Sequence, residues 1–494
     1  MTVSASNFGT PAPAKTSRSS YLRPMSGVWM FMALAAVLAA AALVLPASPQ
    51  DAAPHDRDAR AIFKELVEIN TTDSSGSTTR AAAAMAARLK AAGFADADVQ
   101  VLGPNPRKGN LVARLPGRGT GKPILLLAHL DVVEARKEDW SPDLDPFTFI
   151  ERDGFFYGRG TTDDKAEAAI WIANLIRYQQ EGFIPDRTII VALTADEEGG
   201  DSNGVTWLLQ NHRSLIEAEY ALNEGGDGDL KNGKPIANSV QAAEKMYFSV
   251  GLEVRNAGGH SSLPRKDNAI YSLAAGLTRL AAYEFPVELN EVTRGYFERM
   301  ASIETGQLSA DMKAVAKPSP DLQAAGRLAA ASPLYNALMR TTCVATEISG
   351  GHAENALPQI ARAVVNCRIL PGGDPALVRE TLVRVLADDR ITLTTIWQAV
   401  TSPASPLRPD LMAAVERHTR DLWPGVVVVP TMSTGATDGL MLRNAGIPTY
   451  GVSGLFTDMD DVRAHGRDER MGIREFYAGR EFLYRLVKSL TSGL

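Results

Sequence analysis

The chain has very little cysteine and no block of basic residues, and these two absences narrow its function. Only two cysteines occur among 494 residues, so neither a disulfide-rich scaffold nor a cysteine-rich zinc site can be built. The formal net charge is −6, and no run of lysine and arginine is present that could follow a phosphate backbone. Nucleic acid is therefore excluded as a partner. Any metal ion must be held by histidine, aspartate and glutamate.

Long apolar runs are also absent, with one exception near the amino terminus. Residues 27–45 carry no charge, follow a polar basic stretch without acidic residues, and precede a linker rich in proline and alanine. This pattern predicts an export signal. The run is also long enough to remain as a membrane anchor, since about 20 apolar residues span a bilayer. Both alternatives make residues 1–54 a signal or anchor with its linker, and both predict an exported protein, periplasmic or extracellular.

The remaining chain is predicted to be an α/β protein interrupted by an insertion. Amphipathic helical patterns alternate with short apolar runs, and the continuous apolar run ILLLAHLDVV is typical of a central strand buried on both faces. From about residue 246 the runs alternate with period two, as half-exposed antiparallel strands do. We therefore predict a mainly parallel sheet with an inserted α+β lid or dimerisation domain. The predicted ranges are 55–245 and 400–494 for the catalytic domain and 246–399 for the insertion.

Acidic and histidine residues follow several of the predicted strands. Functional groups in open α/β sheets gather at the carboxyl ends of strands. Each position alone has an ordinary explanation, such as a helix N-cap or a solvated acidic loop. Together they would supply enough ligands for two zinc ions with a shared carboxylate, which can activate a water and polarise a carbonyl group. The positions are His129 with Asp131, Asp163, Glu197 with Glu198, Glu224, and His465.

These motifs resemble a known family of enzymes. HLD, GRGTTDDK, DEEGG, NEGG, GGHSS, NALP and a final HG-x-x-E segment occur in the family's order over roughly residues 60–490. The chain resembles the co-catalytic zinc peptidases that include carboxypeptidase G, acetylornithine deacetylase, succinyl-diaminopimelate desuccinylase and aminoacylase. Within that family it looks most similar to the carboxypeptidase S branch. One departure is that the last motif reads HGRDE, whereas the family usually has HG-x-N-E.

The resemblance implies a role for each motif residue. Asp163 would bridge two Zn²⁺ ions, for which Co²⁺ or Mn²⁺ could substitute. His129 and Glu224 would complete one site, and Glu198 and His465 the other. Glu197 would be the general base for a metal-bridging water, and Asp131 would orient His129. The Asp163–Asp164 peptide bond would be cis.

The inserted domain would supply the substrate contacts. By resemblance, His260 reaches the scissile carbonyl group, often from the partner subunit of a homodimer. Asn355 and Arg368 match residues that bind the substrate carboxylate, and arginine suits a carboxylate because its planar fork makes two parallel hydrogen bonds. Gly435 would line the same pocket.

The predicted function is hydrolysis of a peptide or N-acyl-amino-acid bond beside a free carboxylate. An aminopeptidase or dipeptidase of the same family is the first alternative, and a catalytically inactive binding relative is the second. Asn355 and Arg368 speak against recognition of a free amine, and the filled ligand and base positions speak against an inactive relative. The substrate side chain is left open.

The two cysteines lie in neighbouring predicted strands. Cys343 and Cys367 stand on either side of a glycine-rich turn, so antiparallel pairing would place them opposite each other. A disulfide and simple packing are both compatible with this arrangement outside the cytoplasm.

Overall fold

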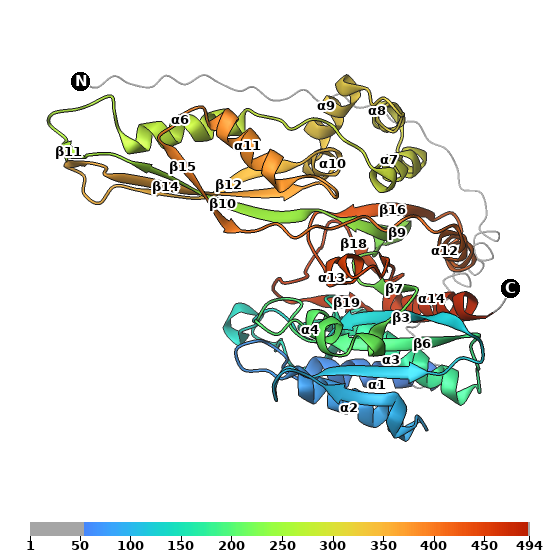
Figure 1. The fold of residues 1–494 in the computed structure, drawn as a ribbon. Helices are drawn as coiled ribbons and strands as arrows, with labels where there is room; N and C mark the ends of the chain where they lie inside the picture. Colours follow the sequence, from blue (N-terminus) through green and yellow to red (C-terminus); the bar gives the residue numbers. More distant parts are fainter. Residues whose placement is uncertain (1–53, 493–494) are drawn as a thin grey trace, which may run out of the picture. The chain divides into compact units, whose positions relative to one another are not determined.

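The structure is a computed structural model that describes residues 54–492. Its largest sheet has ten strands of mixed direction and is here called the large sheet. Its order is β1-β2-β6-β3-β7-β17-β9-β8-β18, and β16 pairs with β9 (Figure 1). The central pairs β6–β3, β3–β7 and β7–β17 are parallel, as predicted. The strands are β1 (Val99–Leu102), β2 (Asn110–Leu115), β3 (Gly121–His129), β6 (Arg187–Thr194), β7 (Tyr220–Asn223), β8 (Gly228–Lys231), β9 (Lys234–Glu244), β16 (Val427–Ser433), β17 (Thr449–Gly451) and β18 (Phe456–Asp458).

Helices cover both faces of the large sheet. Along β3, Leu126 packs in one hydrophobic core, while its neighbours Leu125 and Leu127 pack in a second core on the other face. This double burial explains the unbroken apolar run from Ile124 to Ala128 in β3. The first core includes α1 (Pro54–Glu68), α2 (Thr78–Ala91), α3 (Lys165–Gln180), α12 (Pro409–Leu422) and α14 (Ile473–Thr491), and the second includes α4 (Gly204–Asn211), α5 (Arg213–Ile216) and α13 (Gly439–Asn444).

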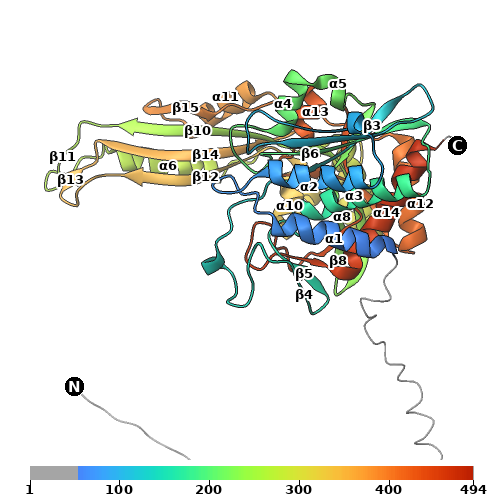
Figure 2. The ribbon, with the colours of Figure 1, turned by 90° about the horizontal axis from the view of Figure 1, so that it is seen from below.

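A second, antiparallel sheet of four strands, here called the lid sheet, continues directly from the first. β9 ends at Glu244 and β10 begins at Met246, so Lys245 is the single residue between these strands of the two sheets. The order is β12-β14-β10-β15, and α6 and α11 pack on one face (Figure 2). The elements are β10 (Met246–Arg255), α6 (Ala269–Ala281), β12 (Thr342–Gly350), β14 (Ile360–Ile369), α11 (Pro375–Leu386) and β15 (Ile391–Trp397).

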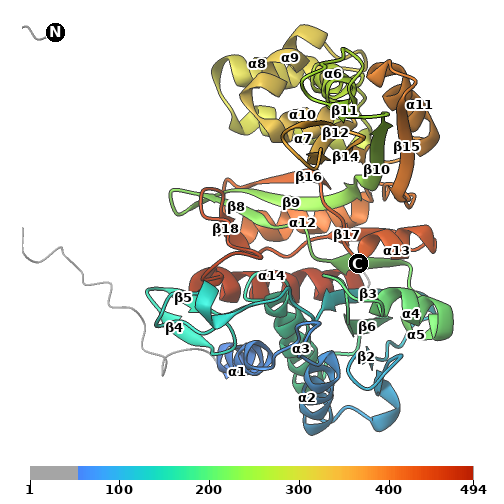
Figure 3. The ribbon, with the colours of Figure 1, turned by 90° about the vertical axis from the view of Figure 1, so that its left-hand side faces the viewer.

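Residues 284–340, within the predicted insertion, form four helices (Figure 3). Their buried side chains, among them Phe297 and Met300, join the first core of the large sheet and not the core of the lid sheet. The segment lies within the predicted insertion but is anchored on the catalytic side. The helices are α7 (Glu291–Ile303), α8 (Gly306–Val315), α9 (Leu322–Ala331) and α10 (Pro333–Met339).

Two small sheets carry motif residues. β11 (Gly259–His260) pairs with β13 (Ala356–Leu357), which brings the GGHSS and NALP segments together. β4 (Ile150–Arg152), β5 (Phe155–Tyr157) and β19 (Arg470–Gly472) form a three-stranded sheet beside the GRGTTDD and HGRDE segments. The sequence did not predict these short strands or the β8–β9 hairpin, because they lack a long apolar pattern.

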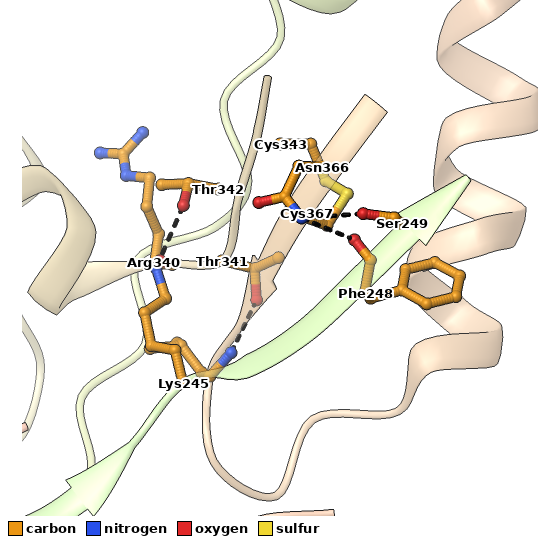
Figure 4. Close-up of a disulfide and its surroundings, with 10 residues drawn as sticks. Lys245, Phe248, Ser249, Arg340, Thr341, Thr342, Cys343, Asn366 and Cys367 are labelled. Carbon is orange, nitrogen blue, oxygen red and sulfur yellow. Dashed lines mark hydrogen bonds between the residues drawn. A yellow bond between two sulfur atoms is a disulfide. The ribbon is translucent and has the colours of Figure 1, made fainter. Parts of the chain in front are cut away.

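The two cysteines form a disulfide. Cys343 on β12 lies opposite Cys367 on β14, and their sulfur atoms are bonded (Figure 4). Of the two alternatives left by the sequence, the disulfide is therefore the one in the structure. Among the residues from 54 to 492, no helix is long and apolar enough to cross a membrane. The apolar segment 27–45 lies outside the described residues.

Candidate metal centre

The predicted metal ligands converge at one edge of the large sheet. His129 is the last residue of β3, Glu197 and Glu198 follow β6, and Glu224 follows β7. These three strands are parallel neighbours, so their carboxyl ends meet at the same edge. Asp163 reaches this edge from the turn before α3, and His465 reaches it from the loop between β18 and β19.

Asp163 lies between the two histidines. Its Oδ1 atom is 2.9 Å from His129 Nε2, and its Oδ2 atom is 3.1 Å from His465 Nε2. Glu224 Oε2 lies 3.8 Å from His129 Nε2, on one side of Asp163. Glu198 Oε1 lies 2.8 Å from His465 Nε2, on the other side. The carboxylate of Asp163 thus faces two separate groups of ligand atoms.

The electrostatics of the cluster favour a cation. Burial raises the pKa of Glu224 well above its ordinary value, and the carboxylates of Glu197 and Asp163 reinforce the rise. Burial likewise raises the pKa of Glu197. Burial opposes protonation of His129, but the surrounding carboxylates outweigh it and raise the pKa of His129 well above normal. Hydrogen bonds to Asp163 and Glu198 raise the pKa of His465 to about 10.

The donor set fits a divalent metal ion. His129, Glu197 and Glu224 form one group whose ligand atoms lie within 4.8 Å of one another, and His129, Asp163 and Glu198 form another. Imidazole nitrogens and carboxylate oxygens are zinc ligands, and crowded carboxylates are stabilised when a cation lies between them. A cavity of about 470 Å³ adjoins the cluster, with Asp163 and Glu224 in its wall.

Asp131 contacts the loop after β6 more closely than it contacts His129. Its carboxylate is 3.7 Å from His129 Nδ1, which instead lies 3.0 Å from the Asp131 backbone carbonyl oxygen. The two carboxylate oxygens accept hydrogen bonds from the amides of Glu197 at 3.2 Å and Glu198 at 2.9 Å. The backbone carbonyl of Asp131 thus lies on the imidazole and its carboxylate holds the loop, and the role of Asp131 in orienting His129 stays a prediction.

Glu469 is a buried residue whose role the sequence did not reveal. Its carboxylate accepts hydrogen bonds from the Arg159 guanidinium at 2.7 Å, the Gly160 amide at 3.1 Å, and the Thr162 amide and hydroxyl at 2.8 Å each. It thereby fixes the turn that presents Asp163. The Asp163–Asp164 peptide bond is cis, as predicted.

The predicted substrate residues of the β11–β13 ribbon lie apart from the metal ligands. His260 is exposed, and its Nδ1 atom lies 2.8 Å from Ser262 Oγ. The Asn355 backbone carbonyl accepts a hydrogen bond from the Ser261 amide at 3.0 Å, and His260 pairs with Ala356, so the two predicted residues are neighbours. No contact joins either side chain to a metal ligand within the described part of the chain.

Arg368 and Gly435 lie nearer to the link between the sheets. Arg368 is on β14 opposite Tyr247, and its guanidinium lies 4.6 Å from the centre of the Tyr247 ring. No acidic partner contacts Arg368 among the described residues, so the guanidinium is available to an anion. Gly435 follows β16, and its amide donates to Ser433 Oγ at 3.0 Å.

The fold and this cluster define a class of protein, the metal-dependent hydrolases. Residues 125–489 match the model of peptidase family M20/M25/M40. The human N-fatty-acyl-amino acid synthase/hydrolase PM20D1 is 28% identical over 378 residues, which cover 74% of each chain. The probable carboxypeptidase S-like 2 of Dictyostelium discoideum is 30% identical over 381 residues, covering 74% of this chain and 72% of the relative.

Solved structures show the same fold. The M20 family metallo-carboxypeptidase Sso-CP2 from Sulfolobus solfataricus superposes with a TM-score of 0.62 at 17% identity, covering 87% of this chain and 98% of that chain. The protein therefore belongs to peptidase family M20/M25/M40 and is a metallohydrolase of the peptidase and amidohydrolase type. This membership confirms the resemblance on which the sequence analysis relied.

Proposed function

We propose that the protein is a dizinc hydrolase that cleaves a peptide or N-acyl-amino-acid bond next to a free carboxylate. The observation that carries the proposal is the position of Asp163 between His129 and His465, at 2.9 and 3.1 Å. A carboxylate with one oxygen toward each of two ligand groups is the arrangement needed to share two metal ions.

Five side chains would hold the metals. His129 and Glu224 serve one ion, Glu198 and His465 serve the other, and Asp163 serves both. Zinc ions held by these residues would lower the pKa of a bound water and polarise the scissile carbonyl group. The donor set is also acceptable to Co²⁺ or Mn²⁺, because carboxylates and imidazoles bind all three.

Glu197 would act as the general base. Its carboxylate belongs to the same group of ligand atoms as His129 and Glu224, and its amide is held by Asp131 at 3.2 Å. Burial keeps its pKa high, which suits a group that must accept a proton from water and then release it. Glu197 takes that proton and delivers it to the leaving nitrogen atom.

Arg368 would select substrates with a free carboxylate. Its guanidinium is half-buried, stacks over Tyr247 and contacts no acid within residues 54–492. Gly435 would line the same pocket, whereas Asn355, which lies with His260 beyond the far end of β10, would reach it only from the partner subunit of a homodimer. The similarity to an N-fatty-acyl-amino acid synthase/hydrolase and to a probable carboxypeptidase S-like protein supports a substrate that ends in an amino acid.

A substrate panel tests this function. Zinc-loaded protein should hydrolyse N-acyl amino acids and N-blocked dipeptides with a free carboxylate, and should lose activity when that carboxylate is amidated. Metal analysis should find two zinc ions per chain. Hydrolysis restricted to dipeptides with a free amine, whatever the state of the carboxylate, would instead support the dipeptidase alternative.

We also propose that His260 acts in a homodimer. It is exposed on β11, at the opposite end of β10 from Lys245, and contacts no metal ligand in its own described chain. Mixing inactive His260→Ala with inactive Glu197→Ala protein tests the idea. Mixed dimers regain activity only if His260 serves the partner's site. Failure to regain activity, with subunit exchange confirmed, contradicts it.

Export is a further proposal. The apolar segment 27–45 and the Cys343–Cys367 disulfide both suit a protein outside the cytoplasm, where disulfides persist. Fractionating cells that express the full chain, with and without an alkaline wash of the membranes, would separate an anchored protein from a released one. Recovery of the protein in the cytoplasm would contradict export.

A further inference from the structure

Asp438 is a buried carboxylate that no motif of the sequence had singled out. It lies between β16 and α13 and is only 3% exposed. One oxygen accepts a hydrogen bond from Asn203 Nδ2 at 2.6 Å, and the other accepts from Thr194 Oγ1 at 3.1 Å. Burying a carboxylate is unfavourable unless donors surround it, so these two contacts determine its place.

Both partners of Asp438 flank the loop that carries Glu197. Thr194 is the last residue of β6, just before the loop. Asn203 caps α4, just after the loop, by accepting from the Thr206 amide at 2.9 Å. Asn203 Nδ2 also donates to the Asp196 backbone carbonyl at 3.2 Å. Asp438 therefore joins the two ends of the Glu197 loop.

The Glu197 loop has a backbone conformation that needs support. Asp196 has φ of 57°, in the left-handed region that side chains other than glycine seldom adopt. Such a residue persists when its surroundings hold it. The Asp196 carboxylate accepts from Ser202 at 3.1 Å and pairs with Lys108, while Asn203 holds its carbonyl oxygen.

Thr437, the residue before Asp438, is hydrogen-bonded to Glu244, which ends β9 just before Lys245. The Thr437 hydroxyl donates to Glu244 at 2.5 Å, and the Thr437 amide donates to the same carboxylate at 3.2 Å. Glu244 is fully buried and also pairs with Arg443 at 2.8 Å. The next residue, Lys245, donates to the backbone oxygens of Arg340 at 2.8 Å and Ala337 at 2.9 Å, which precede β12. Figure 4 shows Lys245 beside Arg340 and Thr342.

We propose that Asp438 is a positioning residue for the general base. The proposal rests on the proposed role of Glu197. Through Asn203 and Thr194, Asp438 fixes the Glu197 loop at both ends, and through Thr437 the same segment is fixed to the link that leads into the lid sheet. Displacement of a reacting group by about 1 Å can reduce a rate about 100-fold, so loss of this support acts on turnover and not on substrate affinity.

Kinetics of Asp438 variants test the proposal. Asp438→Ala should lower kcat about 10- to 100-fold, change KM less than about threefold, and leave the bound metal unchanged. Asp438→Asn should recover most of the loss, because its amide oxygen still accepts from Asn203 and its amide group can donate to Thr194. Asp311→Ala is the matched control. Asp311 is a buried carboxylate on α8, 4% exposed and paired with Arg327 at 2.6 Å.

Milder variants keep the test informative if Asp438→Ala does not fold. Asn203→Ser retains a helix cap but loses the donor to Asp438, and Thr194→Val loses the other donor. Both should lower kcat with KM preserved. A rise in KM alone, or a fall in kcat no larger than that of Asp311→Ala, would overturn the proposal. Glu197→Gln separates the claim that Glu197 is the base from the claim that Asp438 positions it. If Glu197→Gln stays active, Glu197 is not the base. If Glu197→Gln is inactive while Asp438→Ala keeps full turnover, only the positioning role of Asp438 fails.

Discussion

The large sheet and the lid sheet carry their functional residues in different ways. In the large sheet, His129, Glu198 and Glu224 lie at the carboxyl ends of neighbouring parallel strands and meet at one edge. The turn before α3 and the loop after β18 place Asp163 and His465 beside them. In the lid sheet, Arg368 lies near the link at Lys245, whereas His260 and Asn355 lie in a ribbon beyond the far end of β10.

This difference separates chemistry from recognition. The metal ligands are already within contact distance of one another, and the segments that carry them are fixed by hydrogen bonds donated to the carboxylates of Asp131 and Glu469. The lid residues are spread along antiparallel strands and contact no ligand among the described residues. Substitutions in the large sheet should therefore act on turnover and metal binding, and those in the lid on substrate affinity and lid stability.

The largest effect is expected at the proposed base. Glu197→Gln keeps the size of the side chain but cannot accept a proton, so kcat should fall about 1000-fold or more. Metal content, measured by elemental analysis, should equal that of the unchanged protein. Activity close to normal with bound metal would remove Glu197 from the mechanism.

A smaller effect is expected from the buried support of the metal-binding turn. Glu469→Gln places an amide group against the donors of Arg159, Gly160 and Thr162, so the turn that presents Asp163 should loosen. Metal affinity should fall about 10- to 100-fold, as for other residues that orient metal ligands. Competition with a chelator measures it.

Its control is the neighbouring Asp468→Asn. Asp468 accepts from the Ser141 amide and hydroxyl, neither of which donates to Glu469. Equal metal loss in both variants would show that the loop as a whole, and not Glu469, determines affinity.

In the lid, Arg368→Lys should change substrate affinity rather than turnover. A lysine cannot make two parallel hydrogen bonds to a carboxylate, so KM should rise about 10-fold with kcat nearly unchanged. Arg362→Lys is the matched control, because Arg362 lies on the same strand but pairs with Glu253 at 2.8 Å. Similar KM values for both variants would argue against carboxylate binding by Arg368.

The smallest effect on activity is expected from the disulfide. Replacing Cys343 and Cys367 with alanine removes a cross-link between residues 24 apart in sequence, which should lower stability by about 3 kcal/mol. Thermal unfolding should show this loss, with metal content unchanged. A reductant should lower the melting temperature of the original protein but not that of the variant. Metal loss in the variant would contradict the independence of the two regions.

Several features of the site could be predicted because short motifs carry them. His129, Asp163 and Glu224 were identified from strand ends and a glycine-rich turn. The places of Cys343 and Cys367 on two adjacent strands predicted that they lie opposite each other, but left a disulfide and simple packing both open. The roles of Glu469 and Asp438 could not be predicted in this way. Each acts through hydrogen bonds to segments far away in the sequence, and nothing in its immediate neighbours indicates those partners.

The sequence by itself determined the alternation of strands and helices, the order of the ligand motifs and the membership of the family. These depend on local patterns, namely apolar runs buried on both faces and polar residues directly after them. Only the tertiary structure decided that Asp131 holds the Glu197 loop, that helices α7 to α10 join the core of the large sheet, and that Asp438 spans the ends of that loop. Such contacts join segments that are far apart in the sequence, so they depend on the packing of the whole chain and no local pattern indicates them.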